Sequence, residues 1–227
     1  MKRLILIALI LTLVTLSSCK NSNNDFEQMI KEYREAKISM YIEENNHYDD
    51  YVVDVAFLGD SLTDGYDVKS YFPNYTVVNR GIGGDTTFDL ENRLQVSVYD
   101  LKPKVIVMLI GANNFSTMFD NYEDILKGFK SKLPNTKVIL LSLTSMSKEW
   151  GKNNKLAAYN NVKIKLLAQK YEYEFVDIYS PLLNLETGEI YAEYTTDGGH
   201  LTPLGYEVIT NTIKETIEEQ ISLFSEK

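Results

Sequence analysis

The sequence contains little cysteine, little histidine and few positive charges for its size. Cys19 is the only cysteine, so no disulfide can form within the chain. Lysine and arginine number 23 against 32 aspartates and glutamates, which gives a net charge of −9. No basic patch offsets this balance, and the composition therefore argues against nucleic acid or anionic lipid headgroups as partners. Histidine, the usual proton carrier near neutral pH, occurs only at His47 and His200.

The chain also lacks internal repeats, low-complexity tracts and any linker that would separate two domains. Its 227 residues, of which 44% are hydrophobic, fit one globular domain with a full core. We therefore expect a single domain over residues 26–227.

Only one long hydrophobic run is present, from Leu4 to Leu16, directly after Lys2 and Arg3. At thirteen residues it is too short to span a bilayer comfortably, and a positive start before a short apolar core is typical of a secretory signal. We expect residues 1–18 to be removed as a signal peptide.

Cys19 completes the stretch Leu16-Ser17-Ser18-Cys19, which resembles the lipobox of bacterial lipoproteins. In such proteins the cysteine is lipidated and becomes the new N-terminus. The resemblance implies a lipid anchor on Cys19, a polar tether over residues 19–25, and an extracytoplasmic protein attached to the cell membrane. A plain secretory signal with an incidental cysteine is the alternative.

Short apolar runs alternate along the chain with stretches of helical periodicity. Buried parallel strands have continuous apolar sequences, and parallel strands need crossover connections. The pattern predicts an α/β domain in which a mainly parallel five-stranded sheet lies between two layers of helices. The expected strands are 52–58, 76–78, 105–110, 138–143 and 175–178, and the expected helices are 26–44, 86–99, 122–132, 155–171 and 203–223.

Four polar patches follow the expected strands. Ser61 comes after the first strand, Gly84 after the second, Asn113 after the third, and Asp197 with His200 after the fifth. In open α/β sheets, ligands bind beyond the carboxyl ends of the strands. We therefore expect these patches to share one site rather than to be unrelated loops.

Ser61 lies in Gly59-Asp60-Ser61-Leu62, where a buried strand gives way to a turn or a helix. A serine beside a base is a nucleophile, but serine and aspartate are also common helix caps at such a place. The motif is weak evidence when it stands alone.

His200 ends the stretch Asp197-Gly198-Gly199-His200, ahead of a helix that starts at Thr202-Pro203. A carboxylate three residues before a histidine could fix the tautomer of the ring and stabilise its charged form. The alternative is a surface histidine in front of a helix cap. His47 has no such partner, and we expect it on the surface.

The stretch Gly81-Ile82-Gly83-Gly84-Asp85-Thr86-Thr87 opens a helix, where its backbone amides could bind an anion. A dinucleotide-binding turn is the competing interpretation, but that turn needs glycine where this chain has Thr86. Asn113, in Gly111-Ala112-Asn113-Asn114, offers a side-chain amide at the end of the third strand. An ordinary turn is its alternative.

Together these motifs resemble those of the SGNH hydrolases, also called the GDSL esterase and lipase family, from about Val52 to about Ile213. The stretch from Asn79 to Thr87 is similar to the platelet-activating-factor acetylhydrolase branch. The resemblance implies a flavodoxin-like SGNH hydrolase fold and chemistry without a cofactor or a metal. The third motif of the family usually ends in aspartate where this chain has Asn114, whose effect on the loop the sequence leaves open.

Matching the motifs position by position implies a role for each residue. Ser61 corresponds to the nucleophile, His200 to the base and Asp197 to the acid that orients the base. The oxyanion donors would be the backbone N–H groups of Ser61 and Gly84 and the side-chain amide of Asn113.

The resemblance implies a serine esterase that forms an acyl enzyme. We expect it to remove short acyl groups, acetyl above all, from carbohydrate or cell-envelope substrates. A lysophospholipase or other lipid-directed esterase, and a non-catalytic surface binding module of the same fold, are the alternatives. Phe115 and Trp150, with Met118, Phe119 and Met146, could line the substrate rim, although core packing is the other role for such side chains. The oligomeric state is left open.

Overall fold

The structure is a computed structural model that describes residues 22–225. The chain divides into two units, residues 1–36 and residues 37–227. Helix α2, Ser22–Asn45, contains the boundary between them and begins before the expected Phe26. The predicted signal peptide, Cys19 and the start of the predicted tether lie outside the described residues, so the lipid anchor stays a prediction.

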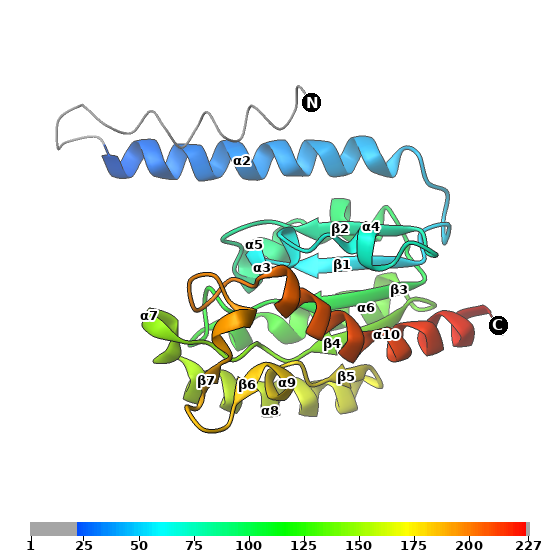
Figure 1. Cartoon of the computed structure of the whole chain (residues 1–227). Coiled ribbons are helices and arrows are strands. Elements are labelled where there is room, and N and C mark those ends of the chain that lie inside the picture. Colours follow the sequence, from blue (N-terminus) through cyan, green and yellow to red (C-terminus); the bar gives the residue numbers. More distant parts are fainter. Residues whose placement is uncertain (1–21, 226–227) are drawn as a thin grey trace. The chain divides into compact units, whose positions relative to one another are not determined.

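Five parallel strands form the central sheet, in the order β2-β1-β3-β4-β5 (Figure 1). β1 pairs with β2 on one side and with β3 on the other, so that Gly59 lies opposite both Gly81 and Leu109. The carboxyl ends of all five strands therefore lie along one edge, and the predicted parallel sheet is confirmed. The strands are β1 Val55–Gly59, β2 Val77–Gly81, β3 Val105–Leu109, β4 Lys137–Leu141 and β5 Glu174–Val176.

Helices cover both faces of the sheet, as the sequence predicts. α10 packs on β3 and β4 and lies in front of the sheet in Figure 1, whereas α6 lies behind it and contacts α5 and α8. The four helices are α5 Thr87–Asn92, α6 Tyr122–Lys132, α8 Asn154–Tyr171 and α10 Pro203–Ser225. Among the helices within residues 22–225, none is both long enough and apolar enough to cross a membrane.

Helix α6 has the bounds that its sequence predicts, because its charges and its apolar spacing agree. Glu123 and Asp124 lie in the first turn and Lys130 and Lys132 in the last, which complements the helix dipole at both ends. Ile125, Leu126 and Phe129 are buried on the face toward the sheet.

The structure departs from the predicted bounds where backbone geometry overrides the apolar pattern. The first apolar run starts at Val52, but Tyr51 has φ +63° and Val52 is exposed, so β1 begins only at Val55. The helix predicted over 86–99 is α5 followed by a separate π-helical turn, η1 Gln95–Tyr99. After β1, where the sequence allowed a turn or a helix, the structure has the short helix α3 Ser61–Asp64. The sequence did not predict the short helices α4 Val68–Tyr71, α7 Lys148–Gly151 and α9 Tyr179–Leu182, the turns η2 Met118–Asp120 and η3 Ala192–Tyr194, or the hairpin of β6 Leu183–Asn184 with β7 Glu189–Ile190.

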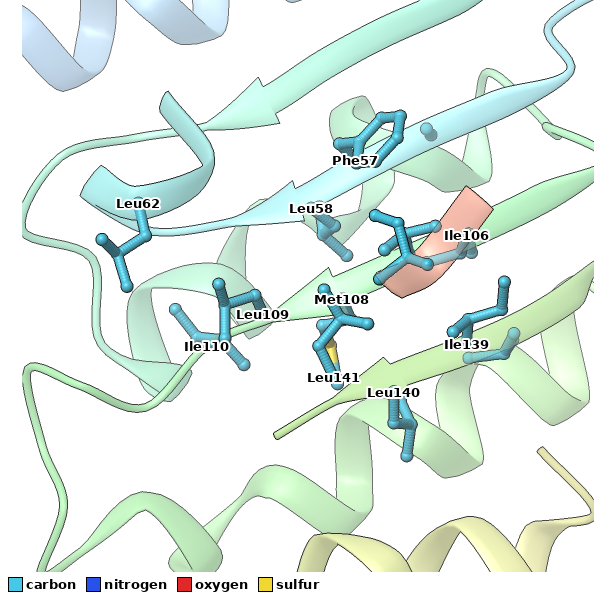
Figure 2. Packing of buried hydrophobic residues seen from close by; sticks show 14 of the residues in the cluster. Phe57, Leu58, Leu62, Ile106, Met108, Leu109, Ile110, Ile139, Leu140 and Leu141 are labelled. Carbon is cyan, nitrogen blue, oxygen red and sulfur yellow. The ribbon is translucent and has the colours of Figure 1, made fainter. Parts of the chain in front are cut away.

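The core lies on both sides of the central strands. β1 and β3 are buried along their whole length, and their side chains pack above and below the ribbons (Figure 2). Leu58, Ile106 and Ile139 expose none of their surface. A strand buried in this way holds the residues just beyond its end in a fixed place, and Ser61 is the second residue after β1.

Candidate active site

Ser61 is the first residue of α3, directly beyond the carboxyl end of β1. Asp60, not Ser61, caps this helix, because its carboxylate accepts a hydrogen bond from the backbone N–H of Leu62 at 3.1 Å. The capping interpretation of the motif therefore belongs to Asp60. The hydroxyl of Ser61 does not cap the helix and faces the loop that carries His200.

The loop before α10 is folded around the carboxylate of Asp197. One carboxylate oxygen accepts the backbone N–H groups of Gly199, at 2.9 Å, and of His200, at 2.7 Å. The other oxygen lies 2.7 Å from Nδ1 of the His200 ring. A single side chain thus fixes both the turn and the orientation of the imidazole.

These hydrogen bonds also set the charge of Asp197. Partial burial acts to raise its pKa, but the hydrogen bonds from the His200 ring and from the N–H groups of His200 and Gly199 outweigh that effect, and the pKa is lowered. An ionised carboxylate only accepts, so Nδ1 of His200 carries a proton, and in the neutral ring Nε2 presents a lone pair. Nε2 lies 3.0 Å from Oγ of Ser61. His200 can therefore accept the hydroxyl proton of Ser61.

Asn113 and Gly84 lie on two loops that are joined by a hydrogen bond. Nδ2 of Asn113 donates to the backbone carbonyl of Asp85 at 2.9 Å, and the second N–H of the amide remains for another acceptor. Gly84 is exposed and has φ +82°, a left-handed conformation that favours glycine. Asn113 lines the same pocket as Ser61 and His200, whereas Gly84 is not among the residues that line it.

Asn114 holds the Asn113 loop in a way that an aspartate could not. Its side-chain oxygen accepts the backbone N–H of Thr87 at 3.3 Å, and its Nδ2 donates to the Thr87 hydroxyl at 2.9 Å. The hydroxyl of Thr87 in turn donates to the side-chain oxygen of Asn121 at 2.7 Å. An ionised aspartate has no N–H to donate, so this chain uses asparagine and threonine together to join the two loops.

A small pocket of about 30 Å³ opens beside Ser61 and His200. Three of its walls, Leu62, Thr144 and Met146, are buried side chains. Thr144 follows β4, so the rule that sites gather at the carboxyl ends of strands could have found it. The residues that line the pocket are Ser61, Leu62, Ala112, Asn113, Thr144, Met146, Trp150, Gly199 and His200.

Of the side chains predicted for the rim, Met146 and Trp150 line this pocket. Trp150 exposes 38% of its surface. Its ring is nearly perpendicular to the His200 ring, and the two ring centroids are 6.4 Å apart. A Cβ atom at Gly199 would lie only 3.0 Å from the indole, so glycine at this position lets the tryptophan approach the histidine loop.

Phe115, also predicted for the rim, packs against the core and is not among the residues that line this pocket. Asn160 of α8 holds its backbone in place by donating to the Phe115 carbonyl at 2.8 Å. Met118 is fully buried, and Phe119 packs on Tyr122 with the two ring centroids 5.6 Å apart. Neither residue lines the pocket.

The arrangement supplies the parts that acyl transfer requires. It contains a hydroxyl beside a base, a carboxylate that orients the base, and an amide donor in the same pocket. Within residues 22–225, no three His, Cys, Asp or Glu side chains are placed to hold a metal ion.

Comparison with known proteins identifies the family to which most of the chain belongs. Residues 57–208 match the GDSL-like Lipase/Acylhydrolase family. Platelet-activating factor acetylhydrolase IB subunit alpha2 from Rattus norvegicus is 30% identical over an alignment of 188 residues, gaps included, that covers 74% of this chain and 80% of that protein.

Two solved structures share the fold at 26% identity. A Streptococcus pneumonia protein, provisionally described as a platelet activating factor, aligns with a TM-score of 0.79 over 88% of this chain and 100% of its own. A GDSL-like lipase from Bacteroides thetaiotaomicron aligns with a TM-score of 0.69 over 80% of this chain and 97% of its own.

Proposed function

Because the chain belongs to the GDSL-like lipase/acylhydrolase family, we propose that it is a serine esterase that removes short acyl groups, acetyl above all, through an acyl enzyme on Ser61. The observation that carries this proposal is the unbroken series of hydrogen bonds from Asp197 through His200 to Ser61. This series supplies a nucleophile, a base and an orienting acid with the proton positions that ester hydrolysis needs.

In the proposed reaction, Oγ of Ser61 attacks the ester carbonyl carbon while Nε2 of His200 takes the hydroxyl proton. The tetrahedral intermediate then expels the alcohol, which receives that proton from His200, and the acyl group stays on Ser61. Water attacks the acyl enzyme by the same route, with His200 again as base. Asp197 remains ionised throughout and stabilises the imidazolium.

The oxyanion of the intermediate needs hydrogen-bond donors that are already in place. We assign this role to the free N–H of the Asn113 amide and to the backbone N–H groups of Ser61 and Gly84. The bond from Asn113 to the Asp85 carbonyl supports the assignment, because it fixes the amide plane relative to the loop between β2 and α5, residues 82–86, here called the glycine loop.

The size of the pocket supports a preference for short acyl groups. A volume of about 30 Å³ suits the methyl of an acetyl group better than a long chain. We expect kcat/KM on p-nitrophenyl esters to be highest for acetate and to fall by about tenfold or more at butyrate, since each methylene that does not fit costs about 1–3 kcal/mol. A maximum at octanoate or beyond would contradict the proposal.

Met146 is the wall whose removal tests the pocket directly. Met146→Ala is expected to raise the butyrate-to-acetate ratio of kcat/KM by about tenfold, because it opens the buried side of the pocket. Met108→Ala is the matched control, since Met108 is equally buried, in β3, and does not line the pocket. Both variants are expected to lose about 2–5 kcal/mol of stability, but only Met146→Ala should change the acyl preference. An unchanged ratio would show that the acyl group lies elsewhere.

The alcohol part of the ester must lie outside so small a pocket, at its mouth. Trp150 offers a partly exposed aromatic surface there, beside His200, on which the apolar face of a sugar ring can pack. We therefore favour acetylated carbohydrate as the substrate class. The acidic net charge supports this choice over anionic lipids.

A lipid-directed esterase is the second candidate, because the 30% identical relative is named as an acetylhydrolase of platelet-activating factor. Rates of acetate release from acetylated xylo-oligosaccharides and from platelet-activating factor, measured on the same preparation, separate the two. A higher kcat/KM on the oligosaccharide supports the carbohydrate assignment, and a higher value on the lipid overturns it.

We also propose that Cys19 carries the lipid anchor that its sequence context predicts. Acyl chains contribute about 0.8 kcal/mol per buried methylene, and two or more hold a protein stably on a membrane. When the full chain is produced in a bacterium that processes lipoproteins, the protein is expected to enter the detergent phase of Triton X-114. Cys19→Ser should move it to the aqueous phase. Wild-type protein in the aqueous phase would contradict the anchor, and Cys19→Ser protein in the detergent phase would indicate a different one.

A further inference from the structure

One buried guanidinium lies behind the loops that carry the proposed oxyanion donors. We propose that Arg93 is a positioning residue that fixes the geometry of all three donors at once. This inference rests on the esterase function and the donor roles proposed above. Arg93 has no part in the mechanism itself, and it exposes only 4% of its surface, so it does not touch substrate.

The guanidinium of Arg93 makes hydrogen bonds to four groups, at the ends of β1 and β2, in the glycine loop and in η1. Nε donates to the carboxylate of Asp85 at 2.6 Å, and Asp85 is fully buried. Nη2 donates to the carbonyl of Gly59 at 2.9 Å, and Nη1 donates to the carbonyl of Arg80 at 2.9 Å and to the hydroxyl of Ser97 at 2.8 Å. The ends of β1 and β2 and the glycine loop are therefore fixed to one rigid planar group.

Two of these contacts, those with Asp85 and Gly59, lead to the donors within a short path. The carbonyl of Asp85 accepts Nδ2 of Asn113, so the residue whose carboxylate Arg93 binds also orients the Asn113 amide. The peptide of Gly84 directly precedes Asp85. Gly59, whose carbonyl also accepts the N–H of Ile82 at 3.1 Å, lies two residues before Ser61. A shift of the guanidinium would displace all three donors together.

Only arginine can make this set of contacts. Its planar fork presents five N–H donors in fixed directions, whereas lysine presents one compact ammonium at the end of a flexible chain. A buried ion pair is by itself weak evidence for a role in stability, since well-packed apolar residues often replace one at no cost. The arrangement of Arg93 is better explained by the precision it imposes on the loops, since a misplacement of about 1 Å can cost about a hundredfold in rate.

Arg80 offers a matched control for Arg93. It is also a fully buried arginine, but its guanidinium pairs with Glu44 and donates to the side chain of Asn45 at 2.8 Å. Neither partner belongs to the loops of the site. Arg80→Lys therefore loses a buried fork whose two hydrogen bonds go to α2, and it keeps the backbone carbonyl that Arg93 binds.

The test compares the two arginines on p-nitrophenyl acetate, at a temperature at which circular dichroism shows each variant to be folded. Arg93→Lys is expected to lower kcat by roughly ten- to a hundredfold with KM within about threefold of wild type, because oxyanion donors act in the transition state. Arg80→Lys is expected to keep kcat within about threefold. Equal losses in both variants, or wild-type kcat in Arg93→Lys, would overturn the proposal.

A double-mutant cycle with Asn113→Ala separates positioning from general stabilisation. If Arg93 acts through the oxyanion donors, part of its effect must vanish once one donor is gone, and the double variant should lose at least about threefold less than the product of the single losses. Multiplicative losses would overturn the role of Arg93.

If Arg93→Lys does not fold, Asp85→Asn takes its place, because asparagine keeps an acceptor for Nε. Wild-type protein without esterase activity would overturn the proposed function, whereas an active wild type with multiplicative losses overturns only this inference.

Discussion

Ser61→Ala is expected to lower kcat for p-nitrophenyl acetate by about 10⁶, to the level left by binding and the oxyanion donors alone. The physical reason is that alanine has no atom to form the acyl enzyme, so the two-step route through His200 closes. A fluorophosphonate should label wild-type protein at Ser61 and should not label Ser61→Ala. Unchanged turnover in Ser61→Ala would overturn the proposed nucleophile, and binding of acetylated glycan without turnover in wild type would favour a non-catalytic binding module.

Ser61→Ala should lose activity without a comparable loss of stability. The helix cap is Asp60 and not Ser61, so alanine at position 61 is expected to change the free energy of unfolding by no more than about 0.5 kcal/mol. Ser70→Ala is the matched control. Ser70 is an exposed serine of α4 whose hydroxyl donates to Asp67 at 2.6 Å, and its loss should leave kcat unchanged.

The sequence predicted that Ser61 and His200 lie in one site, although they are 139 positions apart in the chain. The reason is topological: in a parallel sheet, every carboxyl end lies on one edge, so residues that follow different strands share a rim. The apolar runs identified the strands, and the polar residues beyond them identified the rim. Hydrogen-bond contact among Ser61, His200 and Asp197 follows from the structure, while their catalytic roles stay predictions.

Which residues of a rim loop face the pocket could not be predicted in the same way. Phe115 and Trp150 both follow a strand and are both aromatic, so pattern does not distinguish them. The difference arises from tertiary contacts: Asn160 holds the Phe115 backbone toward α8, while Gly199 leaves space for the indole of Trp150. Both partners lie far from these residues in the sequence.

The contacts that support the site were also hidden from the sequence. Arginine is rarely fully buried, so Arg93 at the end of α5 would ordinarily be expected in solvent. It is buried because the helical run breaks after Asn92 and turns the side chain under the ends of β1 and β2, where Asp85 neutralises it. Asn114 is a similar case, since its effect depends on Thr87, which the sequence alone does not place beside it.

Asp197→Asn is expected to lower kcat by about 10⁴. The asparagine oxygen can still accept the N–H groups of Gly199 and His200, so the turn should persist. The amide N–H₂ would then face Nδ1 of the ring and favour the tautomer that carries its proton on Nε2. That tautomer cannot accept the proton of Ser61, and the charged ring loses its counter-ion as well.

Asp177→Asn is the control for the turn itself. Asp177 also accepts two backbone N–H groups from the residues that follow it, Tyr179 at 2.9 Å and Ser180 at 3.1 Å, but no histidine lies against it. Its replacement should leave kcat within about threefold of wild type. Comparable losses of kcat in both variants would show that Asp197 acts only by holding its loop.

The pH dependence of stability gives Asp197→Asn a second readout. The pKa of Asp197 is lowered from the ordinary 3.8, so its charged hydrogen bonds stabilise the folded state fully above that value, and this contribution is lost as the pH falls toward the lower folded-state pKa. Wild type should therefore melt above Asp197→Asn at pH 7, and the difference should shrink below about pH 4. The loss of kcat should instead be present at every pH at which wild type is active, because the asparagine amide favours the tautomer that cannot accept the proton of Ser61. A rate loss that disappeared together with the stability difference would mean that the carboxylate supports the loop and not the reaction.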